Sequence, residues 1–426
     1  MINMNEFAAP SNSAFLNRRI QIENAESTED PLYRSAFEHD RDRIIHSRAF
    51  RRLMHKTQIF NSKTNDHIRN RLTHTMEVYQ ISRSLGKALS LNGELIEAIA
   101  LGHDLGHTPF GHVGERALHN ILMGHSKRVR LEVESRACGG FKHNFQGVAL
   151  LDQIEVGKPN CKGLNVTLAV REGILKHTGN KMRFGENGDK KEEVSYPNLD
   201  LTSIDVDMPS FTLEGQVVAI ADEIAQCTHD LEDAYRQRII DKEDLKNIDM
   251  VKYATEKYGI ELDSCQNTND VRMNLLYHMI NMLIRDVYTA STKRISEHST
   301  IPRFIDKESC ITEKLIAFSD QMQEMVNDLD SRKRDQILLS REVSIEDSKA
   351  EYIIEQIFKA YYEHPMQLPT YILERYCSFY GKQRASLKKT ELVKDPRFIR
   401  LICDHIGSMT DQFAEREYRR LYHPDF

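Results

Sequence analysis

Apolar residues recur every three or four positions along most of the chain, which is the spacing of one buried helical face. The pattern begins near Pro31 and continues through RSAFEHDRDRIIHSRAFRRLMHK. It returns in residues 74–91, 93–103, 144–155 and 213–240, and again in much of the last hundred residues. Alternating strand patterns are scarce, and only residues 194–208 could form a short hairpin or simply a loop. The pattern therefore predicts a mainly α-helical protein.

Changes in composition along the chain predict three parts. Residues 1–30 are polar and rich in Asn, Ser and Glu, so we expect a flexible N-terminal arm. Residues 31–240 carry the strongest helical periodicity and form the expected core, while residues 241–426 form a further helical C-terminal region. Residues 179–211 interrupt two helical runs with many Gly, Asn, Asp and Lys residues, which predicts a surface excursion.

Composition limits the cellular locations and the classes of binding partner that we expect. The chain has 64 acidic and 58 basic residues, and the net charge of −6 argues against coating nucleic acid along its whole surface. No apolar segment is long enough for a membrane span, and the N-terminus lacks the pattern of a signal peptide. The seven cysteines are scattered without a CxxC pair, as free thiols of a cytoplasmic protein would be. We therefore expect a cytoplasmic location and no membrane partner.

The stretch HDLGHTPFGHVGE, residues 103–115, concentrates three histidines and two acids. His103 and Asp104 are adjacent at a predicted helix end, so an ion held there needs further ligands from other helices. His74 and Asp222 are the candidates, because Asp222 is an acid within an apolar run and requires a cation or a hydrogen-bond network. Two imidazoles and two carboxylates suit a divalent metal, with Mg²⁺ or Mn²⁺ favoured. The alternative is that each residue is a hydrogen-bonded structural group.

The ordered H…HD…D set resembles the HD-domain metal-dependent phosphohydrolases. The extended stretch is similar to the deoxyguanosine triphosphate triphosphohydrolase branch, and so are RDRIIHSRAFRRLMHKTQIF, NRLTHTMEV, FKHNFQGVALL, GILKHTG, ADEIAQCTHDLEDA and DHIGSMTDQFA. The resemblance implies an HD-domain helical bundle that hydrolyses dGTP or another dNTP to the deoxynucleoside and inorganic triphosphate. It also implies that four residues hold the metal: His74, His103, Asp104 and Asp222.

His112 and Glu115 are three residues apart and become neighbours if the segment is helical. A carboxylate that holds one imidazole nitrogen prepares the ring for proton transfer near neutral pH. The resemblance implies that His112 is the catalytic acid or base and Glu115 its partner. The alternative is an ordinary pair of neighbours on a helix surface.

The resemblance also implies contacts with the substrate. It assigns phosphate contacts to Arg71 and His143, with Asn144 beside His143, and a sugar 3′-hydroxyl contact to Gln58. His107 is either a phosphate contact, which we favour, or a residue that stabilises the loop. Asp230 and Gln226 lie at helical spacing from Asp222, so both are expected to line the same pocket. Relatives commonly have tyrosine where this chain has Gln226, which leaves the preference for guanine open. Lys176 and His177 are weaker candidates.

A basic segment from Arg41 to Lys56 has two interpretations: a salt-bridged helix face, or an anion surface for an activating dNTP or single-stranded DNA. The resemblance further implies a homo-oligomer, with a hexamer preferred over a tetramer. Two other functions fit an HD core, namely a nucleotide phosphatase or phosphodiesterase and a non-catalytic nucleotide sensor. The pair of His112 and Glu115 argues against the sensor, because a binding protein does not need a proton-transfer group.

Overall fold

The computed structural model describes residues 4–21, 34–58, 68–134, 136–157, 161–184, 190–265, 267–297 and 310–424. Within them the chain is mainly α-helical, which confirms the predicted fold class. The first half contains α1 (Ala36–His46), α2 (Arg48–Arg52), α3 (Arg71–Ala88), α4 (Gly93–Gly102), α5 (Gly111–Leu122), α6 (His143–Ala149), α7 (Leu168–Lys176) and α8 (Leu213–Arg236). The strands β1 (Lys181–Phe184) and β2 (Lys190–Glu193) pair antiparallel.

The second half is helical throughout its described residues. Its α-helices are α9 (Lys242–Asn247), α10 (Asp249–Tyr258), α11 (Thr268–Val271), α12 (Tyr277–Glu297), α13 (Asp320–Arg332), α14 (Arg341–Glu363), α15 (Thr370–Tyr380), α16 (Lys389–Leu392), α17 (Pro396–Gly407) and α18 (Asp411–Tyr422). Three π-helical segments adjoin these helices: η5 (Leu150–Ile154), η7 (Arg272–Leu276) and η8 (Lys333–Leu338). None of the described helices is long and apolar enough to cross a membrane.

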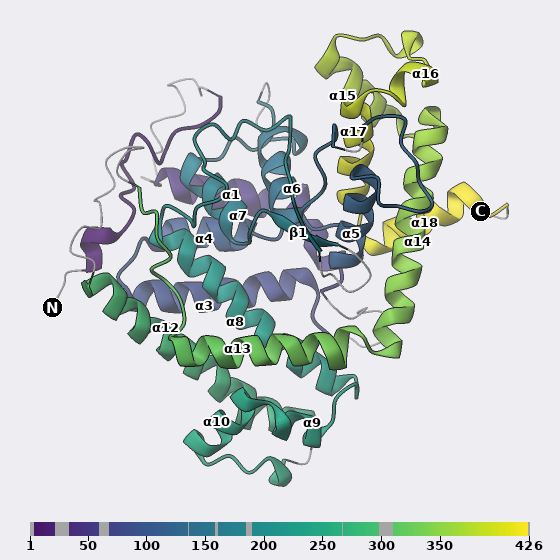
Figure 1. Cartoon of the computed structure of the whole chain (residues 1–426). Coiled ribbons are helices and arrows are strands. Elements are labelled where there is room, and N and C mark those ends of the chain that lie inside the picture. The colour runs from purple at the N-terminus through teal and green to yellow at the C-terminus, as the bar shows by residue number, and fades with distance from the viewer. Residues whose placement is uncertain are drawn as a thin grey trace.

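Helix α8 lies at the centre of the main bundle and packs against α3, α4 and α7 (Figure 1). Its first turn is capped by the Thr212 hydroxyl, which accepts a hydrogen bond from the backbone amide of Gly215. Helix α3 is capped in the same way by Asn70, whose side chain accepts from the amide of Thr73. Such caps satisfy amide groups that a helix start leaves without partners. They set where these helices begin, and therefore where His74 and Asp222 lie along them.

The hydrophobic interior divides into two clusters. One contains the buried side chains of the main bundle together with those of α10, α12 and α13, and it extends as far as Val343. The other joins the apolar face of α5 to α14, α15 and α17, from Ile354 onward. Helix α14 therefore spans both clusters, and α15 to α18 gather beside it (Figure 1). The two clusters do not follow the order of the chain, because the second contains residues of α5 as well as residues from Ile354 onward.

The N-terminal segment differs from the predicted flexible arm over residues 4–21. Ala9 and Leu16 are buried in the main cluster, with 1% and 0% of their surface exposed. The Ala9 amide donates to Glu214, and the Leu168 amide donates to the carbonyl of Arg18. Two buried apolar side chains and these backbone bonds hold the segment in place, although its overall polarity indicated otherwise. The rest of the predicted arm lies outside the described residues.

The predicted surface excursion contains both exposed and buried residues. Its hairpin is formed by β1 and β2, earlier than the residues 194–208 considered for one, and those residues form turns instead. Val194, Tyr196 and Ile204 are buried, so this loop covers part of the core. All seven cysteines are free thiols, as expected from their spacing.

Candidate active site

The turn between α4 and α5 carries the predicted metal pair and is closely packed. His103 and Asp104 follow directly after α4 ends, and both are buried. Gly106 lies so close to α6 that a Cβ atom there would come within 2.0 Å of the His143 carbonyl oxygen. Helix α5 then starts at Gly111 with a φ of 59°, a left-handed conformation that favours glycine. The glycines that interrupt the helical pattern therefore allow this turn to approach α6.

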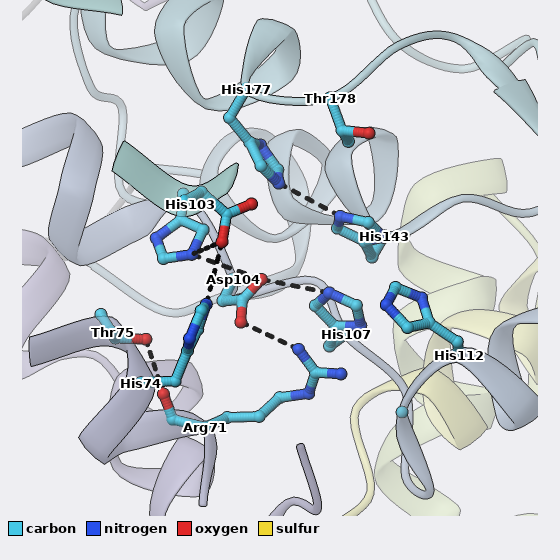
Figure 2. A network of polar contacts seen from close by, with 12 residues as sticks. Arg71, His74, Thr75, His103, Asp104, His107, His112, His143, His177 and Thr178 are labelled. Atoms are coloured by element: carbon cyan, nitrogen blue, oxygen red, sulfur yellow. Dashed lines mark hydrogen bonds and ion pairs between the residues drawn. The ribbon is translucent and has the colours of Figure 1, made fainter. Parts of the chain in front are cut away.

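The structure brings the four predicted ligands together from three elements. His74 Nε2 lies 2.9 Å from Asp222 Oδ1. His103 Nε2 lies 3.6 Å from Asp104 Oδ1 and 3.8 Å from Asp222 Oδ1. In Figure 2 a dashed line joins the ring of His103 to the carboxylate of Asp104, and the ring of His74 lies close by. Two imidazoles and two carboxylates thus converge on one point in the interior.

The donor atoms of this group fit a divalent cation. His103 donates from Nδ1 to the Ala100 carbonyl at 2.7 Å, which leaves the Nε2 lone pair for a ligand. That Nε2 atom is buried and has no hydrogen-bond partner among the described residues. His74, His103 and Asp104 each offer a ligand atom, and these atoms lie within 4.8 Å of one another. The chain can therefore hold a divalent metal at this point.

The four candidate ligands, His74, His103, Asp104 and Asp222, are called the ligand group below. Their surroundings favour the ionised form of both carboxylates. Burial alone would raise the pKa of Asp104, but His107, His103 and Arg71 hold it well below its usual range. Burial would likewise raise the pKa of Asp222, yet the hydrogen bond with His74 lowers it. Burial opposes a charge on His74, whereas the contact with Asp222 raises the pKa of His74. The two carboxylates therefore carry the negative charge that a bound cation would require.

Arg71 and His107 both contact the carboxylate of Asp104. The Arg71 guanidinium donates to Asp104 Oδ2 at 2.8 Å, and His107 Nε2 lies 3.1 Å from Oδ1. Burial, together with the nearby positive charge of Arg71, lowers the pKa of His107 well below its ordinary value. Two guanidinium nitrogens of Arg71 and Nδ1 of His107 are buried without partners among the described residues. The two Arg71 nitrogens are placed to donate to an anion beside the ligand group, whereas Nδ1 of a neutral His107 ring is a lone pair because Nε2 donates to Asp104.

His112, Glu115 and His143 form a hydrogen-bonded chain. His112 Nδ1 lies 3.0 Å from Glu115 Oε2, and the imidazole is about half exposed. The other carboxylate oxygen, Oε1, accepts from the backbone amide and from Nδ1 of His143 at 2.7 and 2.8 Å. Burial would raise the pKa of Glu115, but the two histidines hold it well below its usual range. The predicted pair of His112 and Glu115 is thus part of a hydrogen-bonded chain of three side chains that reaches the buried His143.

The hydrogen-bonded chain of His112, Glu115 and His143 lies next to the ligand group, and two stacked rings connect them. The His107 and His143 rings stack with centroids 3.7 Å apart and planes inclined by 15°. His177, at the end of α7, contributes Nε2 at 3.1 Å from Nε2 of His143 (Figure 2). His177, one of the weaker candidates of the sequence analysis, therefore lies beside the site. Lys176, the other weaker candidate, donates from Nζ to the backbone carbonyls of Asp205 and Met208.

Three residues predicted to lie in the substrate pocket have hydrogen-bond or ion-pair partners within the protein. Asn144 donates from its amide to the Leu175 carbonyl at 2.7 Å, which holds the end of α7. Gln226 donates to Asp222 Oδ2 at 2.9 Å, so it supports a metal ligand. Asp230 forms an ion pair with Lys333 of η8 at 2.9 Å. Helical spacing placed Gln226 and Asp230 near the site, and contacts within the folded chain supply partners for all three side chains.

Gln58 is buried near the α5 start, and its Oε1 has no partner among the described residues. Two neighbours of this segment have roles that the sequence analysis did not identify. Lys56 donates from Nζ to the carbonyls of His107 and Gly407. Asp411 accepts from the backbone amides of Thr57 and Phe110 at 2.8 and 2.9 Å. The C-terminal helices therefore hold the turn that carries His107 and His112.

Two arginines of the basic segment form ion pairs within the chain. Arg41 pairs with Asp42 and Glu97, and Arg52 pairs with Glu155. These ion pairs agree with the salt-bridged interpretation of the segment.

Comparison with known proteins gives family matches to the helical bundle that holds the site and to the C-terminal helices. A family model described as the HD domain matches residues 71–226, and a second one, the phosphohydrolase-associated domain, matches residues 316–420. A protein of Geobacter sulfurreducens and one of Rhizobium meliloti, each called deoxyguanosinetriphosphate triphosphohydrolase-like protein, are 33% and 34% identical to this chain. The alignments cover 92% and 91% of this chain, and 89% of each relative. A relative of the same name from Caldanaerobacter subterraneus is 34% identical over 92% of the chain.

Proposed function

Because this chain belongs to the deoxyguanosinetriphosphate triphosphohydrolase-like family of HD-domain phosphohydrolases, we propose that it hydrolyses a deoxynucleoside triphosphate to the deoxynucleoside and inorganic triphosphate. One observation carries this proposal. The ligand group and the His112–Glu115–His143 chain meet through the stacked rings of His107 and His143. A metal-binding group and a proton-transfer group therefore face the same point, which is what water attack on a phosphorus atom requires.

We assign the metal to His74, His103, Asp104 and Asp222, with Mg²⁺ or Mn²⁺ as the proposed ion. When bound, such an ion withdraws charge from a phosphate oxygen and lowers the pKa of a coordinated water. Asp104 and Asp222 supply the negative charge that holds the ion. Gln226 and Arg71 orient those two carboxylates through the hydrogen bonds that they donate.

His112 is the proposed catalytic acid or base. Glu115 accepts the hydrogen bond from His112 Nδ1, so the opposite nitrogen, Nε2, is free to exchange a proton with the reacting water or the departing sugar oxygen. Half of the imidazole is exposed, which gives a substrate access to it. We propose that the unpartnered guanidinium nitrogens of Arg71 bind the phosphates, that His107 would contact them from Nδ1 only when its ring is protonated, and that Gln58 contacts the sugar.

Gln226 bears on the choice of substrate. Glutamine has no aromatic ring, unlike the tyrosine that the family resemblance implies at this position. Its side-chain amide also donates to Asp222, so we propose that it does not stack on a deoxyribose. We therefore propose that dGTP is one substrate among several dNTPs. We also propose a cytoplasmic homo-oligomer, with a hexamer preferred, and activation by a second dNTP or by single-stranded DNA.

Product analysis tests the proposed reaction. The protein is incubated with each of the four dNTPs, singly and in pairs, with Mg²⁺ or Mn²⁺, and the phosphate products are separated by ion chromatography. Inorganic triphosphate is the expected product, and greater turnover in a pair than in either single reaction would reveal an activating dNTP. A further series with single-stranded DNA tests the other proposed effector.

The same experiment separates the alternatives. Orthophosphate or pyrophosphate as the sole product would contradict the proposal, and orthophosphate release from a dNMP would indicate a nucleotide phosphatase. Tight dNTP binding without any product, in the presence of metal, would indicate a nucleotide sensor.

A further inference from the structure

Arg400 of α17 is a buried arginine that contacts the loop leading into α6. Only 5% of the residue is exposed, and its Nη1 atom donates to the carbonyl of Gly140 and, at 3.4 Å, to that of Cys138. Its guanidinium lies over the ring of Tyr196, with Cζ 3.3 Å from the ring centroid. The other two guanidinium nitrogens, Nε and Nη2, have no hydrogen-bond partner among the described residues. The hydrogen bonds of this buried charge are therefore directed to the loop.

The loop that Arg400 contacts depends on two glycines. Gly139 and Gly140 have φ values of 78° and 72°, in the left-handed region that other residues rarely adopt. A Cβ atom at Gly139 would lie 2.3 Å from the carbonyl oxygen of Ser195. Two consecutive glycines have many other conformations open to them, so contacts from outside the loop must select this one. Arg400 supplies such a contact.

This loop leads directly to the hydrogen-bonded chain of His112, Glu115 and His143. Phe141, which follows Gly140, is fully buried, and His143 comes two residues later. The backbone amide and Nδ1 of His143 both donate to Glu115 Oε1, at 2.7 and 2.8 Å. A shift of the backbone at Gly140 would therefore move both donors relative to the carboxylate that holds His112.

Helix α17 also holds the ring that stacks on His143. The carbonyl of Gly407, at the end of α17, accepts from Lys56 Nζ at 3.0 Å, and the same Nζ donates to the carbonyl of His107. Gly407 lies so close to Phe141 that a Cβ atom there would be 3.1 Å from Phe141 Cζ. The backbones that carry both stacked rings are thus tied to one helix.

We propose that Arg400 is a positioning residue for catalysis: it fixes the Gly140 carbonyl, so that His143 keeps its bonds to Glu115 and its stacking on His107. The assignment rests on the proposed function, because it gives this geometry a role in proton transfer. A lysine cannot replace Arg400 fully, since an ammonium group lacks the planar fork that lies on Tyr196 and reaches the loop carbonyls. The competing explanation is that Arg400 only stabilises the packing of the C-terminal helices.

Steady-state kinetics of triphosphate release by the full-length chain test this assignment with Arg400→Met. Displacing a catalytic group by about 1 Å can cost about 10²-fold in rate, so we expect kcat to fall by about 10- to 100-fold. KM should change by less than about twofold, because Arg71 and the ligand group are untouched. Arg400→Lys keeps the positive charge and a donor, so its kcat should lie between those of the wild type and Arg400→Met.

Arg128→Met is the matched control. Arg128 also lies over a tyrosine, with Cζ 5.6 Å from the ring centroid of Tyr352, and it forms an ion pair with the buried Glu355 of α14. Neither partner belongs to the loop or to the catalytic chain. We expect this variant to lose stability but to keep the wild-type kcat.

Amide hydrogen exchange, followed by mass spectrometry, tests the geometry without turnover. The bond to Glu115 protects the His143 amide, so peptides covering residues 138–146 should exchange at least about 10-fold faster in Arg400→Met than in the wild type. The same peptides should exchange at the wild-type rate in Arg128→Met.

Three results would overturn the proposal: wild-type exchange in these peptides of Arg400→Met, an unchanged kcat in that variant, or an equal loss of kcat in Arg128→Met at equal loss of stability. If Arg400→Met does not fold, as judged by circular dichroism, the same comparisons apply to Arg400→Lys. A wild-type protein that releases no triphosphate would contradict the proposed reaction, whereas the exchange comparison would still decide whether Arg400 holds His143 in place.

Discussion

Asp411 links the C-terminal helices to the turn between α4 and α5, which carries His107 and precedes His112 and is called the catalytic turn below. Replacing Asp411 by asparagine should weaken this link. The carboxylate accepts from the amides of Thr57 and Phe110 and from the Thr57 hydroxyl, and only 5% of the residue is exposed. Asparagine keeps one acceptor but presents an NH₂ group where the second amide donates. At least one charge-assisted hydrogen bond is lost, worth about 1.5–3 kcal/mol. We therefore expect the free energy of unfolding, measured in urea, to fall by about 2 kcal/mol.

The same change should slow catalysis. Phe110 adopts a left-handed backbone conformation, with a φ of 60°, two residues before His112. This conformation is costly for a residue with a side chain, so the turn relaxes when its anchor is lost. Displacing a catalytic group by about 1 Å can cost about 10²-fold in rate, and we expect kcat for dGTP to fall by about 10- to 100-fold.

Asp395→Asn is the matched control for this experiment. Asp395 caps α17 and accepts from Tyr376 and Arg397, so its replacement also removes charge-assisted contacts from the C-terminal region. None of those contacts involves the catalytic turn. We expect a loss of stability with little change in kcat. If Asp411→Asn loses stability to the same degree as the control but keeps the wild-type kcat, the proposed link is wrong.

Three further predictions follow from contacts in and near the site. His112→Ala should retain its metal while turnover falls by about 10²- to 10⁴-fold, whereas Asp104→Ala should lose both metal and turnover. Metal analysis and triphosphate release measure the two effects, and full activity of His112→Ala would contradict the role assigned to His112. Burial raises the pKa of Glu172 from 4.5 to about 7, so the folded state retains a proton that the unfolded state loses, and about 3 kcal/mol of stability should disappear as pH rises from below 4.5 to above 7. Glu172→Gln should remove most of this slope in urea denaturation at several pH values, and an unchanged slope would refute the assignment. Lys333→Met should cost about 3–5 kcal/mol because the Asp230 carboxylate is left buried without its partner, and Asp230→Asn in the same chain should restore part of the loss; an additive double variant would show that the pair is not coupled.

The sequence by itself determined the helical class and the candidate chemistry of residues 103–115. Apolar spacing depends only on the local helical repeat, so it identified α3, α4 and α8 before any packing was known. Spacing by three residues likewise brought His112 and Glu115 together, because neighbours on one helix turn are set by local geometry. The adjacent pair of His103 and Asp104 identified a place for a metal, although not which atoms meet there.

Contacts between distant segments were decided only by the tertiary structure. Asn144 and Gln226 lie where the sequence placed them, but α7 and Asp222 provide partners that local spacing does not reveal. Asp411 meets Thr57 across 354 residues, and His177 meets His143 across 34. Such pairs depend on how the buried helix faces pack, and packing sums many weak contacts over the whole core. His103 and Asp104 could therefore be proposed from a short motif, whereas the contact between His143 and His177 required the folded chain.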